Sequence, residues 1–283
     1  MYKNSEELAW LIRRHTVEMI LLSNGSHIAG VLSEADILAV LYSDILKYDP
    51  KKPKSDERDY LVLSKGHCCA GLYAALAESG FFPVESLKQY CQDDSFLPGH
   101  SSHHLVPGVD ASSGSLGHGL SYAVGIAYAL KKSGLNNKVF VILGDGECDE
   151  GSVWEAVLLS SQLKLSNLFV IVDRNRMQAL DFTESIIPLD DLENKFRSFR
   201  WEAATVDGHK HQSLKEGLLN LKDNDKPHCL ICETTKGKGI SFMENDILWH
   251  YRFPHLGGEY EKAIEELSNS CPKGLSDPYR KEK

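Results

Sequence analysis

Residues 139–178 constrain the fold of this chain more than any other stretch. They contain two short, wholly apolar runs, 139–143 and 168–172, which are too short for helices and are typical of strands. Residues 152–165, between the runs, have the length and composition of one helix. Strands that are apolar throughout are typical of a parallel sheet covered on both faces. The stretch therefore predicts an α/β fold, in which a parallel sheet is flanked by helices.

Polar residues follow both predicted strands. Asp145 comes just after the first strand and Asn175 just after the second. Neighbouring parallel strands lie about 4.8 Å apart, and ligands of open α/β sheets bind at their carboxyl edge. Asp145, Asn175 and the main-chain carbonyl of Met177 would supply two or three hard oxygens, which suits a Mg²⁺ ion that also binds phosphates. The spacing predicts a metal–diphosphate site, although two ordinary turns would give the same pattern.

The same residues carry a resemblance to a known family. Gly-Asp-Gly at 144–146, followed about thirty residues later by Asn175, resembles the thiamine diphosphate motif. Glu-Gly-Ser-Val-Trp-Glu-Ala at 150–156 resembles the transketolases in particular. The resemblance covers nearly the whole chain, but only the first domain of a full-length transketolase. It implies that residues 1–283 form a single diphosphate-binding domain with a peripheral tail from about residue 259.

Histidines in four separate loops match the family pattern. The resemblance implies that they line the active site and move protons at the sugar hydroxyls, for which imidazoles that titrate near neutrality are suited. The loop at 23–30 departs from the pattern, because Gly25-Ser26 stands where Ser-Gly is usual. The implied catalytic residues are His27, His67, His100, His250 and Glu150.

A glycine-rich turn at 113–119, Ser-Gly-Ser-Leu-Gly-His-Gly, resembles the family's loop that contacts the aminopyrimidine of the cofactor. The order of its glycines fits a dinucleotide fingerprint poorly. His118 and Ser115 replace a common glutamine and a common proline. The resemblance implies cofactor binding by His67, Gly114, Ser115, Leu116, Gly146, Glu147, Asn175 and His250, and metal binding by Asp145, Asn175 and Met177.

The implied reaction is transfer of a two-carbon ketol unit between sugars or sugar phosphates. Thiamine diphosphate would carry the chemistry, with Mg²⁺, or Ca²⁺ or Mn²⁺ in its place. In the family, a glutamate on a second, pyrimidine-binding domain activates the cofactor, and Glu150 matches the residue that contacts it. The chain is therefore expected to be the N-terminal subunit of a split transketolase. It would be active only with a separate C-terminal subunit, as a heterotetramer with two copies of each chain.

Other classes remain open on the sequence. The chain resembles, less closely, a subunit of a deoxyxylulose phosphate synthase-like or 2-oxo acid dehydrogenase-like enzyme, and a non-catalytic binding module of the same fold is a further alternative. A zinc site at His100, His103 and His104 is disfavoured, because adjacent histidines do not have ordinary zinc-ligand spacing.

Charge, apolar runs and cysteine content bear on which partners and which cellular location are expected for this chain. A net charge of −9 argues against nucleic acid or an anionic membrane as the main partner. No apolar run approaches the 18 residues of a membrane span. The seven cysteines form no extracellular disulfide framework, so a cytoplasmic location is expected.

Two local expectations concern the flanks of the site. Ser33 and Asp36 make a capping-box pattern that predicts the start of a helix at 37–46. Residues 176–191 show no periodicity and predict a loop.

Overall fold

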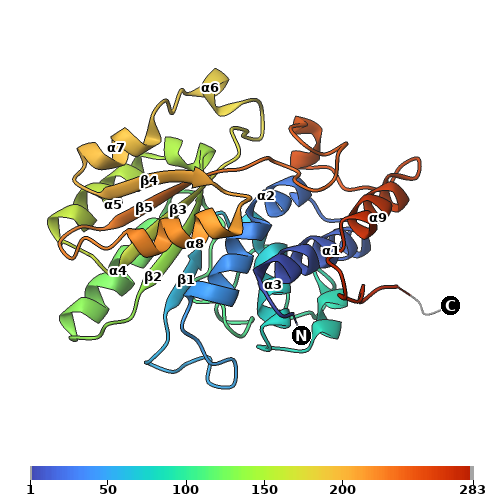
Figure 1. Cartoon of the computed structure of the whole chain (residues 1–283), viewed down its shortest axis with the longest axis horizontal. Coiled ribbons are helices and arrows are strands. Elements are labelled where there is room, and N and C mark those ends of the chain that lie inside the picture. The colour runs from blue at the N-terminus through green and yellow to red at the C-terminus, as the bar shows by residue number, and fades with distance from the viewer. Residues whose placement is uncertain (1, 281–283) are drawn as a thin grey trace.

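The computed structural model describes residues 2–280. Within them, a parallel sheet of five strands has the order β1-β2-β3-β5-β4 (Figure 1). The two strands predicted around the central helix are confirmed, as is the parallel α/β fold. The strands are β1 (Tyr60–Leu63), β2 (Val139–Gly144), β3 (Leu168–Arg174), β4 (Glu202–Asp207) and β5 (His228–Glu233).

Helices cover both faces of the sheet (Figure 1). Helices α4, α5 and α7 enclose one apolar core, and α1, α2, α3 and α8 enclose the other. The helices are α1 (Ser5–Ser23), α2 (Ile28–Val40), α3 (Cys69–Glu78), α4 (His118–Lys132), α5 (Gly151–Gln162), α6 (Thr183–Ile186), α7 (Leu192–Ser198), α8 (His211–Asn220) and α9 (Glu259–Asn269).

Alternation along the strands divides the apolar side chains between these two cores. In β2, Phe140 and Ile142 enter the core with α1, whereas Val141 and Leu143 enter the core with α4. All four are at most 1% exposed. Because β2 is buried on both sides, polar side chains that form a site are expected to meet at the ends of the strands.

The expected start of a helix at residue 37 is wrong, although residues 37–45 are helical, because α2 continues to Val40 and a π-helical turn follows at Leu41–Ile45. Helix α2 begins at Ile28, and Ser33 lies inside it with its hydroxyl 2.6 Å from Asp173 Oδ2. Gly30 allows α2 to lie close to the following segment, since a Cβ there would come 2.9 Å from Cys68 Sγ. Tertiary packing therefore overrides the local capping pattern. The expected loop at 176–191 also contains a short helix, α6.

The C-terminal tail lies against α1. Trp10 Nε1 donates to the carbonyl of Leu267 in α9 at 2.8 Å, and Arg14 pairs with Asp277 at 3.1 Å. The Nδ1 atom of the buried His15 ring forms a hydrogen bond with Tyr279 Oη at 2.7 Å. Within residues 2–280, none of the helices has both the length and the apolar character needed to cross a bilayer.

Replacing Tyr279 tests the tail contact. Tyr279→Phe leaves the fully buried His15 Nδ1 without its partner, and we expect a loss of about 1–3 kcal/mol in the free energy of unfolding. Urea denaturation followed by circular dichroism measures it. Tyr122→Phe, at an exposed tyrosine on α4, is the matched control and should change stability by less than about 0.5 kcal/mol. Equal losses in the two variants would contradict a specific tail contact.

Candidate active site at the carboxyl edge of the sheet

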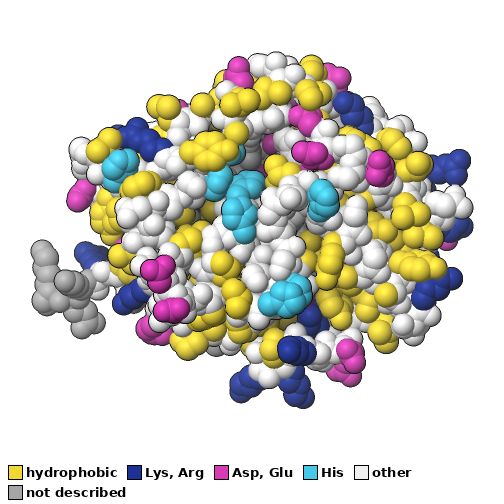
Figure 2. All heavy atoms as spheres, turned by 180° about the vertical axis from the view of Figure 1, so that it is seen from behind, with side chains coloured by type: hydrophobic (Ala, Val, Ile, Leu, Met, Phe, Trp, Pro, Cys, Tyr) yellow, Lys and Arg dark blue, Asp and Glu magenta, His cyan; other side chains and the backbone are white. Residues whose placement is uncertain are grey.

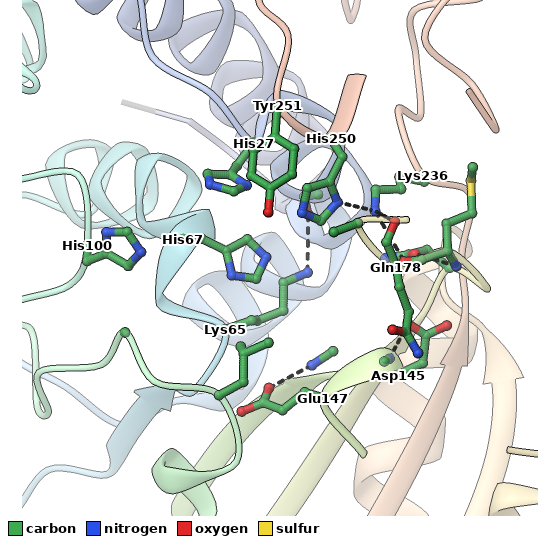
Figure 3. A pocket seen from close by; sticks show the side chains of 18 residues that line it. His27, Lys65, His67, His100, Asp145, Glu147, Gln178, Lys236, His250 and Tyr251 are labelled. Carbon is green, nitrogen blue, oxygen red and sulfur yellow. Dashed lines mark hydrogen bonds between the residues drawn. The ribbon is translucent and has the colours of Figure 1, made fainter. Parts of the chain in front are cut away.

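A cavity of about 350 Å³ lies where the carboxyl ends of β1, β2 and β3 meet. Histidine side chains gather around a hollow on this face (Figure 2), and the close view shows how they point (Figure 3). The structure brings together eleven of the residues predicted from the sequence. They are His27, His67, His100, Gly114, Leu116, Asp145, Gly146, Glu147, Asn175, Met177 and His250.

Ser115 and Glu150 do not line the cavity. Both are exposed. Glu150 lies at the rim of the cavity, immediately before α5. It packs against the glycine-rich turn at 113–119 (the glycine loop), because a Cβ on Gly117 would come 2.7 Å from Glu150 Cβ. Its position leaves the carboxylate available to a molecule that covers the rim.

Asp145 and Asn175 hold the oxygen-rich end of the cavity. Asp145 accepts hydrogen bonds from the backbone N–H groups of Gly146 at 2.9 Å and Arg176 at 2.5 Å. Asn175 Oδ1 accepts from Met177 N–H at 3.2 Å. Burial, assisted by the charge of Asp173, raises the pKa of Asp145 to about 7. A carboxylate in such a place is stabilised by a nearby cation.

Lys236 is a site residue that the sequence reasoning did not select. It is buried, and its Nζ lies 2.8 Å from His250 Nδ1 and donates to the carbonyl of Met177 at 3.1 Å. Burial, with the nearby charge of Lys65, lowers its pKa to about 8. The available signal was the run Thr-Thr-Lys-Gly-Lys-Gly at 234–239, which resembles a phosphate-binding loop.

The other end of the cavity is a wall of histidines. The ring centroid of His27 lies 4.9 Å from that of His67 and 5.2 Å from that of His250. Burial is the main cause that lowers the three pKa values, to about 4 for His27, about 2 for His67 and about 3 for His250. Contrary to the expectation of titration near neutrality, these imidazoles are neutral at pH 7.

His27 combines a strained backbone with a free ring nitrogen. Its φ is +68°, and its backbone N–H donates to the carbonyl of His250 at 3.0 Å. Its Nδ1 is buried and has no hydrogen-bond partner among the described residues. Tyr251 caps the wall, with its ring centroid 5.1 Å from that of His27 and 4.6 Å from that of His250 (Figure 3). This buried nitrogen is suited to a polar group of a ligand.

Glu147 is engaged by the protein itself. Its Oε1 accepts from the Ser64 hydroxyl and from Gly117 N–H at 2.8 Å, and its Oε2 accepts from Gly144 N–H at 3.0 Å. These donors belong to the segment after β1, the glycine loop and the end of β2. Glu147 therefore holds the glycine loop against the sheet, and its carboxylate has few free lone pairs for a cofactor.

A buried ion-pair cluster is centred on Lys65, which lines the cavity (Figure 3). Lys65 Nζ is 2.5 Å from Asp173 and 3.3 Å from Glu34, and all three side chains are at most 2% exposed. Neither oxygen of Glu34 has a hydrogen bond of good geometry with any residue that the structure describes. Burial raises the pKa of Glu34 to about 8, against the opposing effect of Lys65. Asp173 is thus the principal partner of Lys65.

Comparison with known proteins identifies the family to which this chain belongs. Residues 4–251 match the family described as transketolase, thiamine diphosphate binding domain, so the chain contains a domain of that class. The chain belongs to the transketolase family.

Named relatives include short and long proteins. The chain is 44% identical to an apulose-4-phosphate transketolase subunit of Actinobacillus succinogenes, over 95% of this chain and 97% of that one. It is 41% identical to 6-deoxy-6-sulfo-D-fructose transketolase subunit SqwG of a Clostridium species, over 85% and 88%. The transketolase structure from Campylobacter jejuni superposes with a TM-score of 0.86 at 31% identity, over 93% of this chain and 42% of that one. The chain thus spans about two fifths of the solved transketolases. These similarities favour a transketolase subunit over the other thiamine enzymes considered.

The residues of the cavity fit the cofactor of this family. No group of three His, Cys, Asp or Glu side chains suited to a metal occurs within the described part of the chain, so a cation here needs other oxygens as well. Asp145, Asn175 and the Met177 carbonyl would hold it together with diphosphate oxygens. Lys236 would offset the diphosphate charge, and glycines in the lining would let it approach the backbone.

Replacing Asp145 tests the metal end of the cavity. Asp145→Ala removes the charged oxygen ligand, and we expect Mg²⁺-dependent retention of thiamine diphosphate to fall by at least about tenfold while the fold survives. Isothermal titration calorimetry measures it. Asp56→Ala, at an exposed carboxylate, should bind as the unmodified chain does. Unchanged binding by Asp145→Ala would remove Asp145 from the site.

Replacing Glu34 tests the buried cluster through pH. Because the folded-state pKa of Glu34 is raised, the folded chain retains a proton that the unfolded chain releases, so this group lowers stability as pH rises from about 4.5 to about 8. Glu34→Gln removes that decline, and its advantage over the unmodified chain should be larger at about pH 8 than at about pH 5. Urea denaturation at both pH values measures it. Glu155→Gln, at an exposed glutamate of α5, is the control; a pH-independent effect of Glu34→Gln would contradict a raised pKa.

Proposed function

We propose that this chain is the thiamine diphosphate-binding subunit of a two-chain transketolase, which transfers a two-carbon ketol unit from a ketose to an aldose. One observation carries the proposal. The paired oxygens of Asp145 and Asn175 share a cavity with a wall of neutral histidines, in a chain that aligns nearly end to end with a relative named as one subunit of a transketolase.

The residues of the cavity have two proposed roles, cofactor binding and substrate binding. Thiamine diphosphate, when bound, supplies a nucleophilic carbon for attack on a carbonyl group. Lys236 and the metal ligands hold the charged end of the cofactor. His27, His67 and His250 are neutral at pH 7. A neutral imidazole has one nitrogen that donates and one that accepts, so His27 and His67 can bind sugar hydroxyls and pass a proton between them. In His250, Nδ1 already lies 2.8 Å from Lys236 Nζ, which leaves Nε2 for a sugar hydroxyl. Magnesium is the proposed cation, with Ca²⁺ or Mn²⁺ able to replace it.

The proposed partner is a separate chain that carries the pyrimidine-binding domain. Large apolar side chains of the loop after β3 are exposed: Leu180, which follows the cavity residues Gln178 and Ala179, is 84% exposed, and Ile187, farther along the loop, is 53% exposed. Together with the exposed Glu150 at the rim, they support a partner that covers this edge. The word subunit in the names of relatives supports it too. We propose an assembly with two copies of each chain.

A cytoplasmic location completes the proposal. The seven cysteines are free thiols, and Cys68, Cys69, Cys148, Cys229 and Cys232 are buried in the cores. Unpaired thiols of this kind support a reducing compartment.

Reconstitution tests the two-chain proposal. The chain with thiamine diphosphate and Mg²⁺ should show no ketol transfer, and addition of the C-terminal subunit should restore it, because the cofactor is activated from the partner's side. A coupled assay with several ketose donors measures turnover. The complex that contains Asp145→Ala is the negative control. Appreciable turnover by the isolated chain would contradict the two-chain proposal, and pyruvate consumption by the complex would contradict transketolase activity.

A further inference from the structure

Asp173 collects hydrogen bonds at the end of β3, two residues before Asn175. Its Oδ2 accepts from Lys65 Nζ at 2.5 Å and from the Ser33 hydroxyl at 2.6 Å, and its Oδ1 accepts from the Thr234 hydroxyl. The Nδ2 of Asn175 lies 3.3 Å from the same Asp173 Oδ2. The carboxylate is fully buried and is not part of the cavity lining. Asp173 is therefore placed behind the site and not in it.

The donors come from three separate parts of the fold. Ser33 lies in α2, Lys65 follows β1 and Thr234 follows β5. Donors on several sides fix the carboxylate in place, and Lys65 compensates its buried charge. Since an ionised carboxylate only accepts hydrogen bonds, the surface that Asp173 presents to Asn175 is an acceptor surface.

This surface decides which way the Asn175 amide points. The Nδ2 end can donate to Asp173 and lies 3.4 Å from Ser33 Oγ. The opposite orientation would set Oδ1 against a carboxylate oxygen and leave Nδ2 facing the cation. With Nδ2 held, Oδ1 faces the Met177 N–H at 3.2 Å and the end of the cavity that holds Asp145.

We propose that Asp173 is a positioning residue that orients the Asn175 amide, so that the amide oxygen is presented to a divalent cation beside Asp145. The inference rests on the metal–diphosphate site of the proposed function. It assigns no metal contact to Asp173 itself, because Lys65, Ser33 and Thr234 already occupy its oxygens.

A pair of matched variants tests this role. Asp173→Asn and Glu34→Gln each remove one buried carboxylate beside Lys65. Of the two carboxylates, Asp173 lies within hydrogen-bond distance of Asn175. Calorimetry and Mn²⁺ electron paramagnetic resonance on the full chain, with inorganic pyrophosphate as probe, measure cation binding. We expect Asp173→Asn to weaken Mn²⁺ binding by roughly 10–100-fold, and Glu34→Gln to change it by less than about threefold.

Exchanging the two side chains separates orientation from stability. A carboxylate at position 175 has two equivalent oxygens and needs no orientation, so Asn175→Asp combined with Asp173→Asn should restore binding to within about threefold of the unmodified chain. Asn175→Asp alone should not strengthen binding, because it sets two carboxylates side by side. Thr234→Val, which removes one hydrogen bond to Asp173 and nearly keeps the side-chain shape, should give an intermediate loss.

The outcomes are distinct. Normal Mn²⁺ binding by Asp173→Asn, or a folded exchange variant that fails to recover binding, would overturn the positioning role. Equal losses in Asp173→Asn and Glu34→Gln would overturn it as well, since they would reflect only the lost charge beside Lys65. If the unmodified chain bound neither Mn²⁺ nor pyrophosphate, the metal site of the proposed function would fail, and the inference with it.

Discussion

The pairing of β2 with β3 determines where the polar groups of the site lie. Gly144 and Asp173 are partners at the last rung of the two strands, and the backbone N–H of Asp145 donates to the carbonyl of Asp173. This register brings Asp145 beside the residues that follow β3, including Asn175. Because both strands are buried on both faces, the hydrophilic side chains here gather at the carboxyl ends of the strands and just beyond them. The position of the site thus follows from two central strands that are buried on both faces.

Burial acts to raise the pKa of both Asp145 and Asp173, and their net pKa shifts differ because their partners differ. Asp173 accepts from Lys65 and two hydroxyls, and these interactions hold its pKa below its usual value. Among residues 2–280, Asp145 accepts hydrogen bonds only from backbone N–H groups, and burial together with the charge of Asp173 raises its pKa. A carboxylate that the protein has already neutralised serves structure, whereas one left without a counter-charge is available for a cation. Asp173 and Asp145 are the same residue type, and their hydrogen-bond partners distinguish the structural role of Asp173 from the proposed cation-binding role of Asp145.

Local patterns predicted the central part of the fold and missed what depends on distant contacts. The apolar runs around 140 and 170 needed no tertiary information, and Asp145 and Asn175 followed from them. The start of α2 could not be predicted, since Ser33 is buried through contact with Asp173, 140 residues away in the sequence. Lys236 was not selected because its partner carbonyl belongs to Met177, on another loop. The neutrality of the histidines likewise depends on burial, which a motif does not encode.

The backbone of His27 limits how this pocket can be altered. Its positive φ is a conformation that glycine and asparagine tolerate and that β-branched residues avoid. Its N–H also donates to the carbonyl of His250, so two loops more than two hundred residues apart share one hydrogen bond at the histidine wall of the cavity. The bond joins backbone atoms, so a replacement that shifts the backbone at one of these two positions would also affect the other. Tyr251, which is exposed and packs on both rings, offers more freedom.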